Sequence, residues 1–193
     1  MINKRLIFGI IFIAVGVICI SVPLTYDWYT THKNQELVDA MNLLKRDGLD
    51  GDQKELNWSR EELESVYHLE IPSIKLEQFV LPETTEENLA ISLTQIKSDQ
   101  NPELDNISIA GHRGYRSDRH FSQLPNVREG EEILLETDDK RFVYKVSTIM
   151  IVEATQVDVL DNNGPEITLI TCTISGEERV VVKGTLVEVQ ELL

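Results

Sequence analysis

The chain has 193 residues, of which 41% are hydrophobic and 26% charged, a balance typical of folded globular proteins. Its 33 Asp and Glu against 18 Lys and Arg give a formal net charge of −15. This excess argues against nucleic-acid binding, which needs a basic surface to neutralise phosphates. Two cysteines are too few for a disulfide scaffold or a four-cysteine zinc site.

An uncharged, apolar run extends from Leu6 to Leu24 and is interrupted by one serine and one proline. A helix rises about 1.5 Å per residue, so this run roughly spans a hydrocarbon core of about 30 Å. A cleaved signal peptide would need a small-x-small site, which Ser21-Val22-Pro23 does not provide, and a lipoprotein signal would need small residues before Cys19. We therefore predict that residues 1–24 form a short cytoplasmic tip and a retained transmembrane anchor.

Charge is distributed asymmetrically about this segment. Lys4 and Arg5 precede it, and no acidic residue occurs before Asp27. Because basic flanks favour the cytoplasmic side, we predict a single-pass protein of the cell membrane with a cytoplasmic N-terminus and an extracellular body. Cys19 would then lie in the membrane as a small hydrophobic residue, which leaves Cys172 as the only cysteine of the body.

Residues 25–58 are polar and acidic, and we predict that they form a stalk. Within it, three apolar residues spaced by four and three predict a short amphipathic helix over Lys33–Arg46. Ser59-Arg60-Glu61-Glu62 has the pattern of a capping box and predicts a short helix at the start of a domain of residues 59–193.

The rest of the chain alternates short apolar runs with turn residues, which predicts strands. These lie around residues 69–71, 74–76, 79–81, 107–110, 132–136, 141–151, 167–173 and 179–189. Short helical segments are expected over Thr84–Ile96, where apolar residues are spaced by four and three, and over Asp118–Leu124. Seven or eight strands with two or three short helices predict one compact, mainly antiparallel all-β domain, most simply a closed barrel.

Cys172 ends the predicted strand Thr168–Cys172 and is followed by a turn that contains Gly176. Its position at a strand end predicts that it lies at the rim of the barrel. Arg179 begins the next strand, so both side chains could reach the same mouth of the barrel if the two strands are neighbours.

His112 also follows a predicted strand, and it is flanked by Gly111 and Gly114, which would leave room for a substrate backbone. Together with Cys172 and Arg179 it supplies a nucleophile, a proton donor or acceptor, and a cation for a developing oxyanion. Each residue also has a purely structural interpretation, as a core cysteine, a structural histidine or a surface arginine. The residue types alone leave both interpretations open.

Several segments resemble the signatures of sortases, the membrane-anchored cysteine transpeptidases of Gram-positive bacteria. Thr168–Cys172 (TLITC) resembles their TLxTC motif, and Ile109–Arg113 (IAGHR) resembles the segment around their catalytic histidine. Phe121–Leu124 matches the downstream F-x-x-L, and Arg179–Val182 is similar to the strand of their catalytic arginine. Val157–Leu160 fits the stretch that leads to the cysteine strand.

The resemblance implies an eight-stranded sortase barrel and roles for three residues. Cys172 would attack the threonine carbonyl of an LPxTG-like sorting signal and form a thioacyl enzyme. His112 would protonate the departing amine and later accept a proton from the incoming amine, and Arg179 would hold the scissile region and the oxyanion. The same likeness implies substrate contacts from residues beside these motifs: Ala110, Gly111 and Thr171.

The implied partners are surface proteins that bear a sorting signal, the amine of a peptidoglycan precursor, and the membrane. We expect no cofactor. Some sortases bind calcium through acidic loop residues, and five such residues are available here: Glu103, Asp105, Glu153, Asp158 and Asp161.

The subclass is less strongly indicated than the family. Pilin-polymerising class C sortases often carry an Asp-Pro-aromatic lid and a second hydrophobic segment, and this sequence has neither, so we prefer a class A or class D-like enzyme. His112-Arg113-Gly114 and Lys183-Gly184-Thr185 look similar to class C, which stays an alternative. Two further alternatives are a papain-like cell-wall cysteine peptidase and a non-enzymatic, anchored β domain that binds wall polymer.

The segment Leu81-Pro82-Glu83-Thr84-Thr85 itself nearly spells a sorting signal, with Thr85 in place of glycine. It follows a predicted strand, and Pro82 is suited to a turn. We therefore interpret it as a connection within the domain and not as a substrate.

Overall fold

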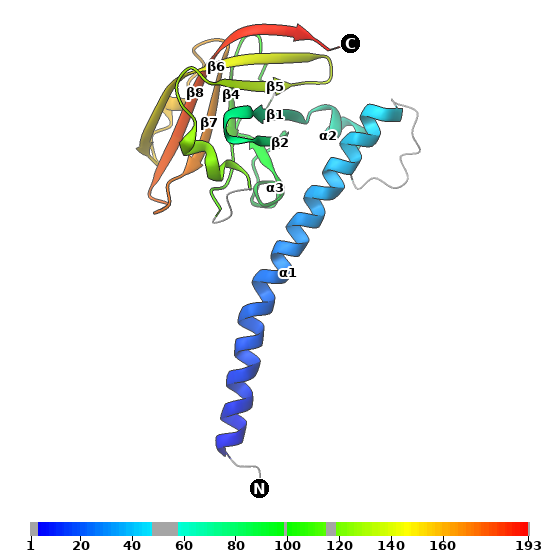
Figure 1. Ribbon diagram of the computed structural model, residues 1–193, viewed down its shortest axis with the longest axis vertical. Helices are drawn as coiled ribbons and strands as arrows, with labels where there is room; N and C mark the ends of the chain where they lie inside the picture. Colours follow the sequence, from blue (N-terminus) through cyan, green and yellow to red (C-terminus); the bar gives the residue numbers. More distant parts are fainter. Residues whose placement is uncertain (1–3, 48–57, 99, 115–118, 193) are drawn as a thin grey trace. The chain divides into compact units, whose positions relative to one another are not determined.

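The computed structural model describes residues 4–47, 58–98, 100–114 and 119–192. Two compact units are present, Met1–Leu49 and Asp50–Leu193. The first contains the long helix α1, and the second contains a β domain with short helices (Figure 1).

Helix α1 (Lys4–Asp47) contains a stretch long and apolar enough to cross a membrane. Phe12 and Ile13 are 76% and 70% exposed, as expected for side chains that face lipid. The predicted stalk helix over Lys33–Arg46 is not separate, because α1 continues without interruption past Pro23. The boundaries at residues 24 and 58 stay predictions, and residues 48–57 of the predicted stalk lie outside the described residues.

The first helix in the described part of the second unit is the short helix α2 (Arg60–Glu64). The capping box is confirmed, because the Ser59 hydroxyl accepts from the Glu62 amide and the Glu62 carboxylate accepts from the Ser59 amide at 2.8 Å. Reciprocal bonds of this kind satisfy two backbone donors that the first turn of a helix leaves free.

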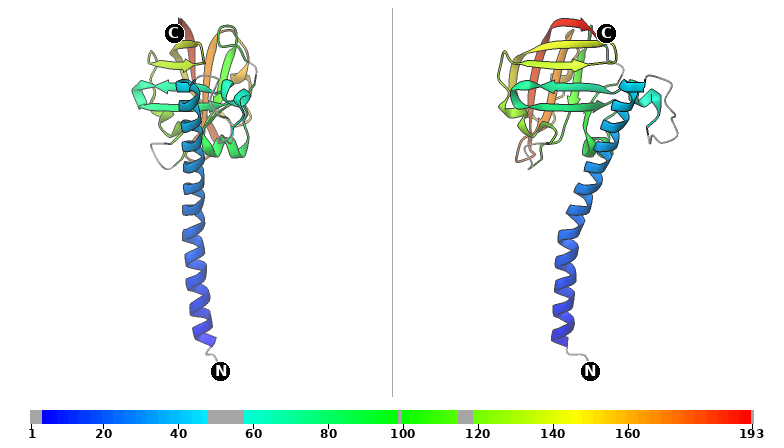
Figure 2. Two further views of the ribbon diagram at one scale, coloured as in Figure 1. Left: turned by 90° about the vertical axis from the view of Figure 1, so that its right-hand side faces the viewer. Right: turned by 45° about the vertical axis from the view of Figure 1, so that its right-hand side comes forward.

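Eight strands form a closed barrel in the order β1-β2-β3-β4-β7-β8-β6-β5 (Figure 2). Six neighbouring pairs are antiparallel, and β2–β3 and β4–β7 are parallel. The predicted closed, mainly antiparallel barrel is therefore confirmed. The strands are β1 (Tyr67–Ile71), β2 (Leu76–Leu81), β3 (Leu93–Gln95), β4 (Asn106–Ala110), β5 (Glu132–Glu136), β6 (Lys140–Glu153), β7 (Glu166–Cys172) and β8 (Glu178–Glu191).

Short helices fill the connections between strands. Phe121 and Leu124, expected on a helical segment with both side chains inward, are fully buried on η4. Asp118, where that segment was expected to begin, lies outside the described residues. The helices are α3 (Glu86–Ile91) and the 3₁₀ helices η3 (Pro72–Ile74), η4 (Phe121–Asn126) and η5 (Asp158–Leu160).

The helix expected over Thr84–Ile96 is wrong in its second half. Helix α3 ends at Ile91, Ser92 is extended, and its hydroxyl donates to the Phe79 carbonyl at 2.6 Å. The next residues form β3, in which Leu93 pairs with β2 and Thr94 with both β2 and β4. Pairing with two strands distant in sequence outweighs the local apolar spacing that favoured a helix.

Apolar side chains form two clusters on opposite faces of the β6–β8–β7 part of the wall. The interior cluster includes Ile167, Leu169 and Val182. Because successive side chains of a strand point to opposite faces, Ile170 and Val181 lie on the outer face. The outer cluster combines strand residues with η5: Val152, Val159 and Val181, with Met150, Leu160 and Ile170 packed against them.

Candidate active site

Cys172 and Arg179 are directly opposite each other on β7 and β8, so the two strands are neighbours, as expected (Figure 1). Opposite residues of an antiparallel pair have Cβ atoms about 4.5–5.5 Å apart. Cys172 is a free cysteine with a partly exposed side chain. The register therefore puts a thiol beside a guanidinium-bearing side chain.

The site lies at a rim of the barrel, as predicted, because Cys172 ends β7 and Arg179 is next to the start of β8, and its side chains are on the outer face. Residues two apart on a strand share a face. Thr171 therefore lies on the same face as the interior residue Leu169, whereas Cys172 lies on the same face as Ile170 of the outer cluster. Cys172 is the last residue of β7, as predicted. It therefore lies at one end of an apolar surface that η5 partly covers.

Arg179 is held by the turn between β7 and β8. Its Nη1 donates to the carbonyls of Gly176 at 3.1 Å and Glu178 at 3.0 Å. The Thr173 amide closes the turn by donating to the Glu178 carbonyl at 3.0 Å. Among the described residues Arg179 forms no ion pair, so its charge is available to a bound anionic group.

His112 follows the end of β4, which runs parallel to β7 with Ala110 registered against Ile170. His112 and Cys172 are each two residues beyond that pair, and neighbouring strands lie about 4.8 Å apart. The Gly111 amide continues the ladder by donating to the Ile170 carbonyl at 3.1 Å. The His112 side chain is exposed and has no hydrogen-bond partner within the described part of the chain. The topology thus brings the ends of the predicted histidine, cysteine and arginine strands together.

The family model that matches this chain is the sortase domain, over residues 69–187. The chain belongs to the sortase family. It is 31% identical over 204 residues to sortase A of Bacillus anthracis, and the matched region covers 96% of this chain and 97% of that protein. Sortases are cysteine transpeptidases that act in the sorting of surface proteins. A papain-like peptidase is excluded by this membership and by the strand-end position of Cys172.

Solved sortase structures share the fold. Sortase A of Listeria monocytogenes has a TM-score of 0.63 at 29% identity and covers 66% of this chain and 90% of its own. The sortase D5 transpeptidase of Clostridium perfringens has a TM-score of 0.58 at 27% identity, with coverage of 70% and 93%. These likenesses identify the barrel of this sortase as the sortase barrel.

The three residues expected to contact substrate differ in their surroundings. Ala110 is partly exposed and is registered against Ile170 of the outer face. Gly111 and Thr171 are buried, and the Thr171 hydroxyl donates to the Gly111 carbonyl at 2.8 Å. This bond ties the residue before His112 to the residue before Cys172.

We had expected Gly111 to leave room for a substrate. It does not, because protein side chains fill the space beside it. A Cβ atom there would lie 2.5 Å from Leu93 Cδ2 and 2.8 Å from Phe121 Cδ2. The missing side chain therefore allows the His112 segment to pack closely on the barrel.

We expect Gly111→Ala to lower the free energy of unfolding by about 1–3 kcal/mol, because overpacking forces buried groups apart. The same change should reduce turnover, since the shift occurs next to His112. Gly184→Ala is the matched control, because its nearest neighbour would be Ile167 Cγ2 at 3.0 Å, a looser contact. Urea denaturation of both variants measures the difference. An equal or smaller loss for Gly111→Ala would contradict this explanation.

Calcium binding by the five acidic residues considered above stays a prediction. No group of three or more His, Cys, Asp or Glu side chains suited to a metal occurs in the described ranges. The Asp105 carboxylate accepts from the Asn101 amide at 2.7 Å and from Asn162 Nδ2 at 2.6 Å, and these bonds lower its pKa. Glu103 instead pairs with Lys140 at 2.5 Å.

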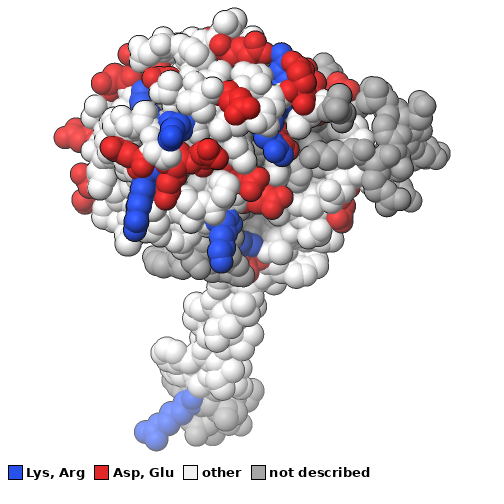
Figure 3. All heavy atoms as spheres, turned by 45° about the horizontal axis from the view of Figure 1, so that its top comes forward, with Lys and Arg blue, Asp and Glu red and all other residues white. Residues whose placement is uncertain are grey.

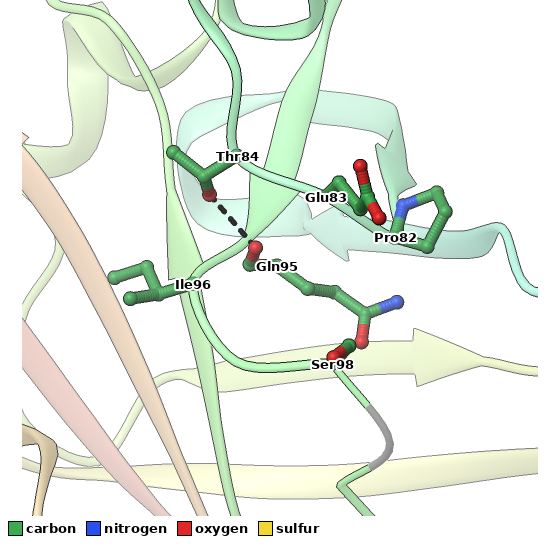
Figure 4. A pocket seen from close by; sticks show the side chains of 6 residues that line it. All are labelled: Pro82, Glu83, Thr84, Gln95, Ile96 and Ser98. Atoms are coloured by element: carbon green, nitrogen blue, oxygen red, sulfur yellow. Dashed lines mark hydrogen bonds between the residues drawn. The ribbon is translucent and has the colours of Figure 1, made fainter.

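A pocket of about 220 Å³ lies where the chain leaves β2 and β3 (Figure 4). The Thr84 hydroxyl donates to the Gln95 carbonyl at 2.7 Å, and Leu81 is fully buried. The sorting-signal-like segment is therefore a connection between β2 and α3, as interpreted from the sequence. Because β3 runs antiparallel to β4, the pocket lies away from the end of β4 that leads to His112. Its lining residues are Pro82, Glu83, Thr84, Gln95, Ile96 and Ser98.

Charged side chains are interspersed over the surface of the domain. On the face drawn in Figure 3, acidic side chains outnumber basic ones, and the basic ones form no continuous patch. The distribution on this face agrees with the net charge of −15, and this face offers no surface suited to a phosphate backbone.

His120 is a residue near the site that the sequence analysis did not single out. Its side chain is only 9% exposed, and burial lowers its pKa to about 4, with smaller contributions from the charges of His112 and Arg119. The only local signal is its position directly before the F-x-x-L segment, which does not reveal burial.

Proposed function

We propose that this sortase cleaves an LPxTG-like sorting signal after its threonine and transfers the new carboxyl end to an amine of a peptidoglycan precursor. The observation that carries the proposal is the meeting of Cys172, Arg179 and the His112 strand end on one outer face. These groups supply a nucleophile, a cation and a proton carrier where an extended peptide can reach them.

In the first step, Cys172 Sγ attacks the threonine carbonyl carbon, and the peptide bond after the threonine breaks. His112 gives its proton to the leaving amine, and a thioacyl enzyme remains. In the second step, an amine attacks the thioester and passes a proton to His112, and the sulfur departs. Arg179 stabilises the oxyanion of both tetrahedral intermediates, and one such donor is worth about 2.7–4 kcal/mol.

The outer apolar cluster supports binding of the apolar part of the signal. Val181 and Val152 form a buried floor, whereas Met150 and Ile170 are only partly buried and can be covered further. Ile170 is on the same face as Cys172 and two residues before it. If the leucine of the sorting signal packs there, the residues that follow it in the peptide can reach the Cys172 thiol.

For the subclass we keep class A or class D-like, with class C as the alternative. Support comes from the similarity along almost the whole chain to a protein named sortase A and from the likeness to a class D structure. We also propose a single-pass protein of a Gram-positive cell membrane with an extracellular catalytic domain. The apolar stretch of α1 and the basic residues before it support that orientation.

The test uses the full chain in detergent micelles with LPxTG peptides and with peptides altered at the leucine, proline or threonine. We expect a product that ends at the threonine, and a transfer product when oligoglycine or a diamino acid is added. Mass spectrometry identifies both. Cleavage without an amine-dependent product would indicate a hydrolase. Absence of any cleavage, with Cys172 slow to react with a thiol reagent, would favour the non-enzymatic binding domain.

A further inference from the structure

We propose that His120 is a positioning residue that holds His112 in place, through a hydrogen bond from its buried imidazole to the Ala90 carbonyl. The inference deepens the proposed function, because it rests on His112 as the proton carrier. It concerns how the segment after β4 is fixed, and it assigns no chemical step to His120.

The backbone of His120 lies directly beside the His112 segment. The Phe121 amide donates to the His112 carbonyl at 3.1 Å, and Arg113 and His120 form an antiparallel bridge. The Ser122 hydroxyl accepts from the Gly114 amide at 3.0 Å and lies 3.2 Å from the Gly114 carbonyl. Backbone hydrogen bonds therefore join the segment that leads from β4 through His112 to the segment that returns through His120.

The side chain of His120 anchors this closed segment to a different element. The ring hydrogen-bonds the Ala90 carbonyl, in the last turn of α3, and Nδ1 is buried without a partner among the described residues. Nε2 is then the donor, and the neutral ring carries its proton there. Carbonyls in the last turn of a helix have no partner within the helix, so this bond satisfies both groups.

The backbone conformation of His120 indicates that the anchor is needed. Its φ of 45° and ψ of −135° lie in a region that residues other than glycine rarely adopt. Such a conformation persists only where the surrounding structure holds it. Here burial of the ring and its bond to Ala90 supply the restraint, and the strained residue is next to the segment that presents His112.

A neutral ring at this position also suits the chemistry of its neighbour. Burial is the largest cause that lowers the pKa of His120 to about 4, and the hydrogen bond to Ala90 opposes it only partly. His120 therefore carries no charge at neutral pH. It can hold His112 without repelling the protonated form that gives a proton to the leaving amine.

Three variants of the full chain separate the hydrogen bond from the other properties of His120. Glutamine places a neutral amide donor three bonds from Cβ, as histidine does, and should keep the bond. Leucine fills the space without a donor, and asparagine keeps an amide donor but is one bond too short. We expect kcat to fall about 10-fold or more in His120→Leu and His120→Asn, with KM within about twofold, and His120→Gln to restore most of the rate.

Amide hydrogen exchange at Phe121 gives a readout independent of activity, because that amide donates to the His112 carbonyl. It should exchange about 10-fold faster in the leucine and asparagine variants, while the interior Leu169 amide is unchanged. A kcat within twofold of the wild type in both variants, or a glutamine variant as slow as leucine, would overturn the proposal. If the wild-type chain turns over no peptide, the proposed function fails, and the exchange rates still decide whether His120 fixes the segment.

Discussion

The Cys172→Ala variant is expected to lose turnover of a sorting-signal peptide completely, by on the order of 10⁶-fold. No other described side chain near the site can replace the nucleophile, because Cys172 is the only cysteine of the barrel. Its partly exposed side chain contributes little to the core, so the melting temperature should stay close to that of the wild type. Peptide cleavage and the mass of the thioacyl adduct measure the loss.

Cys19→Ala is the matched control for this experiment. Cys19 lies in the apolar stretch of α1, and its loss should leave cleavage, adduct formation and transfer unchanged. Cleavage by Cys172→Ala at more than a thousandth of the wild-type rate, after the threonine, would contradict a mechanism through a thioacyl enzyme. Loss of the adduct in Cys19→Ala would instead show that Cys19, and not Cys172, carries the reactive thiol.

The strands that carry Cys172 and Arg179 could be predicted because each is rich in apolar and β-branched residues and is bounded by turn residues. Their separation along the chain also suits a hairpin, and the structure pairs them directly. The face on which they act could not be predicted. Ile167 and Leu169 face the interior and Ile170 packs outside under η5, so both sides of β7 are apolar and alternation does not distinguish them.

Two other features depend on contacts between segments that are distant in sequence. Leu93 and Thr94 form a strand because Val80 and Ala110 are aligned beside them, and their own spacing resembles a helix. Gly111 and His120 owe their roles to Leu93 and Ala90, respectively. The motif identifies the residues that we propose meet the substrate, whereas the groups that hold these residues become evident only when the barrel is closed.

Arg179→Ala is expected to lower kcat by a hundredfold or more, with a smaller change in KM. Arg179 is directly opposite Cys172 on the neighbouring strand, and the charge of its guanidinium has its full effect only when the carbonyl oxygen becomes an oxyanion. A hundredfold loss corresponds to about 2.7 kcal/mol of transition-state stabilisation. Steady-state kinetics with a fluorogenic sorting-signal peptide separates kcat from KM.

Two further variants show whether this loss belongs to the position of Arg179 and to the shape of its side chain. Arg128 is exposed, and Arg128→Ala removes one positive charge without touching β7 or β8, so its kinetics should match the wild type. Arg179→Lys keeps the charge but not the planar fork and should recover only part of the rate. The bonds that Arg179 donates to the Gly176 and Glu178 carbonyls lie in an exposed turn where water can replace them, so stability should change little. A fall in kcat that follows the melting temperature across these variants would assign Arg179 to holding the turn and not to stabilising the oxyanion.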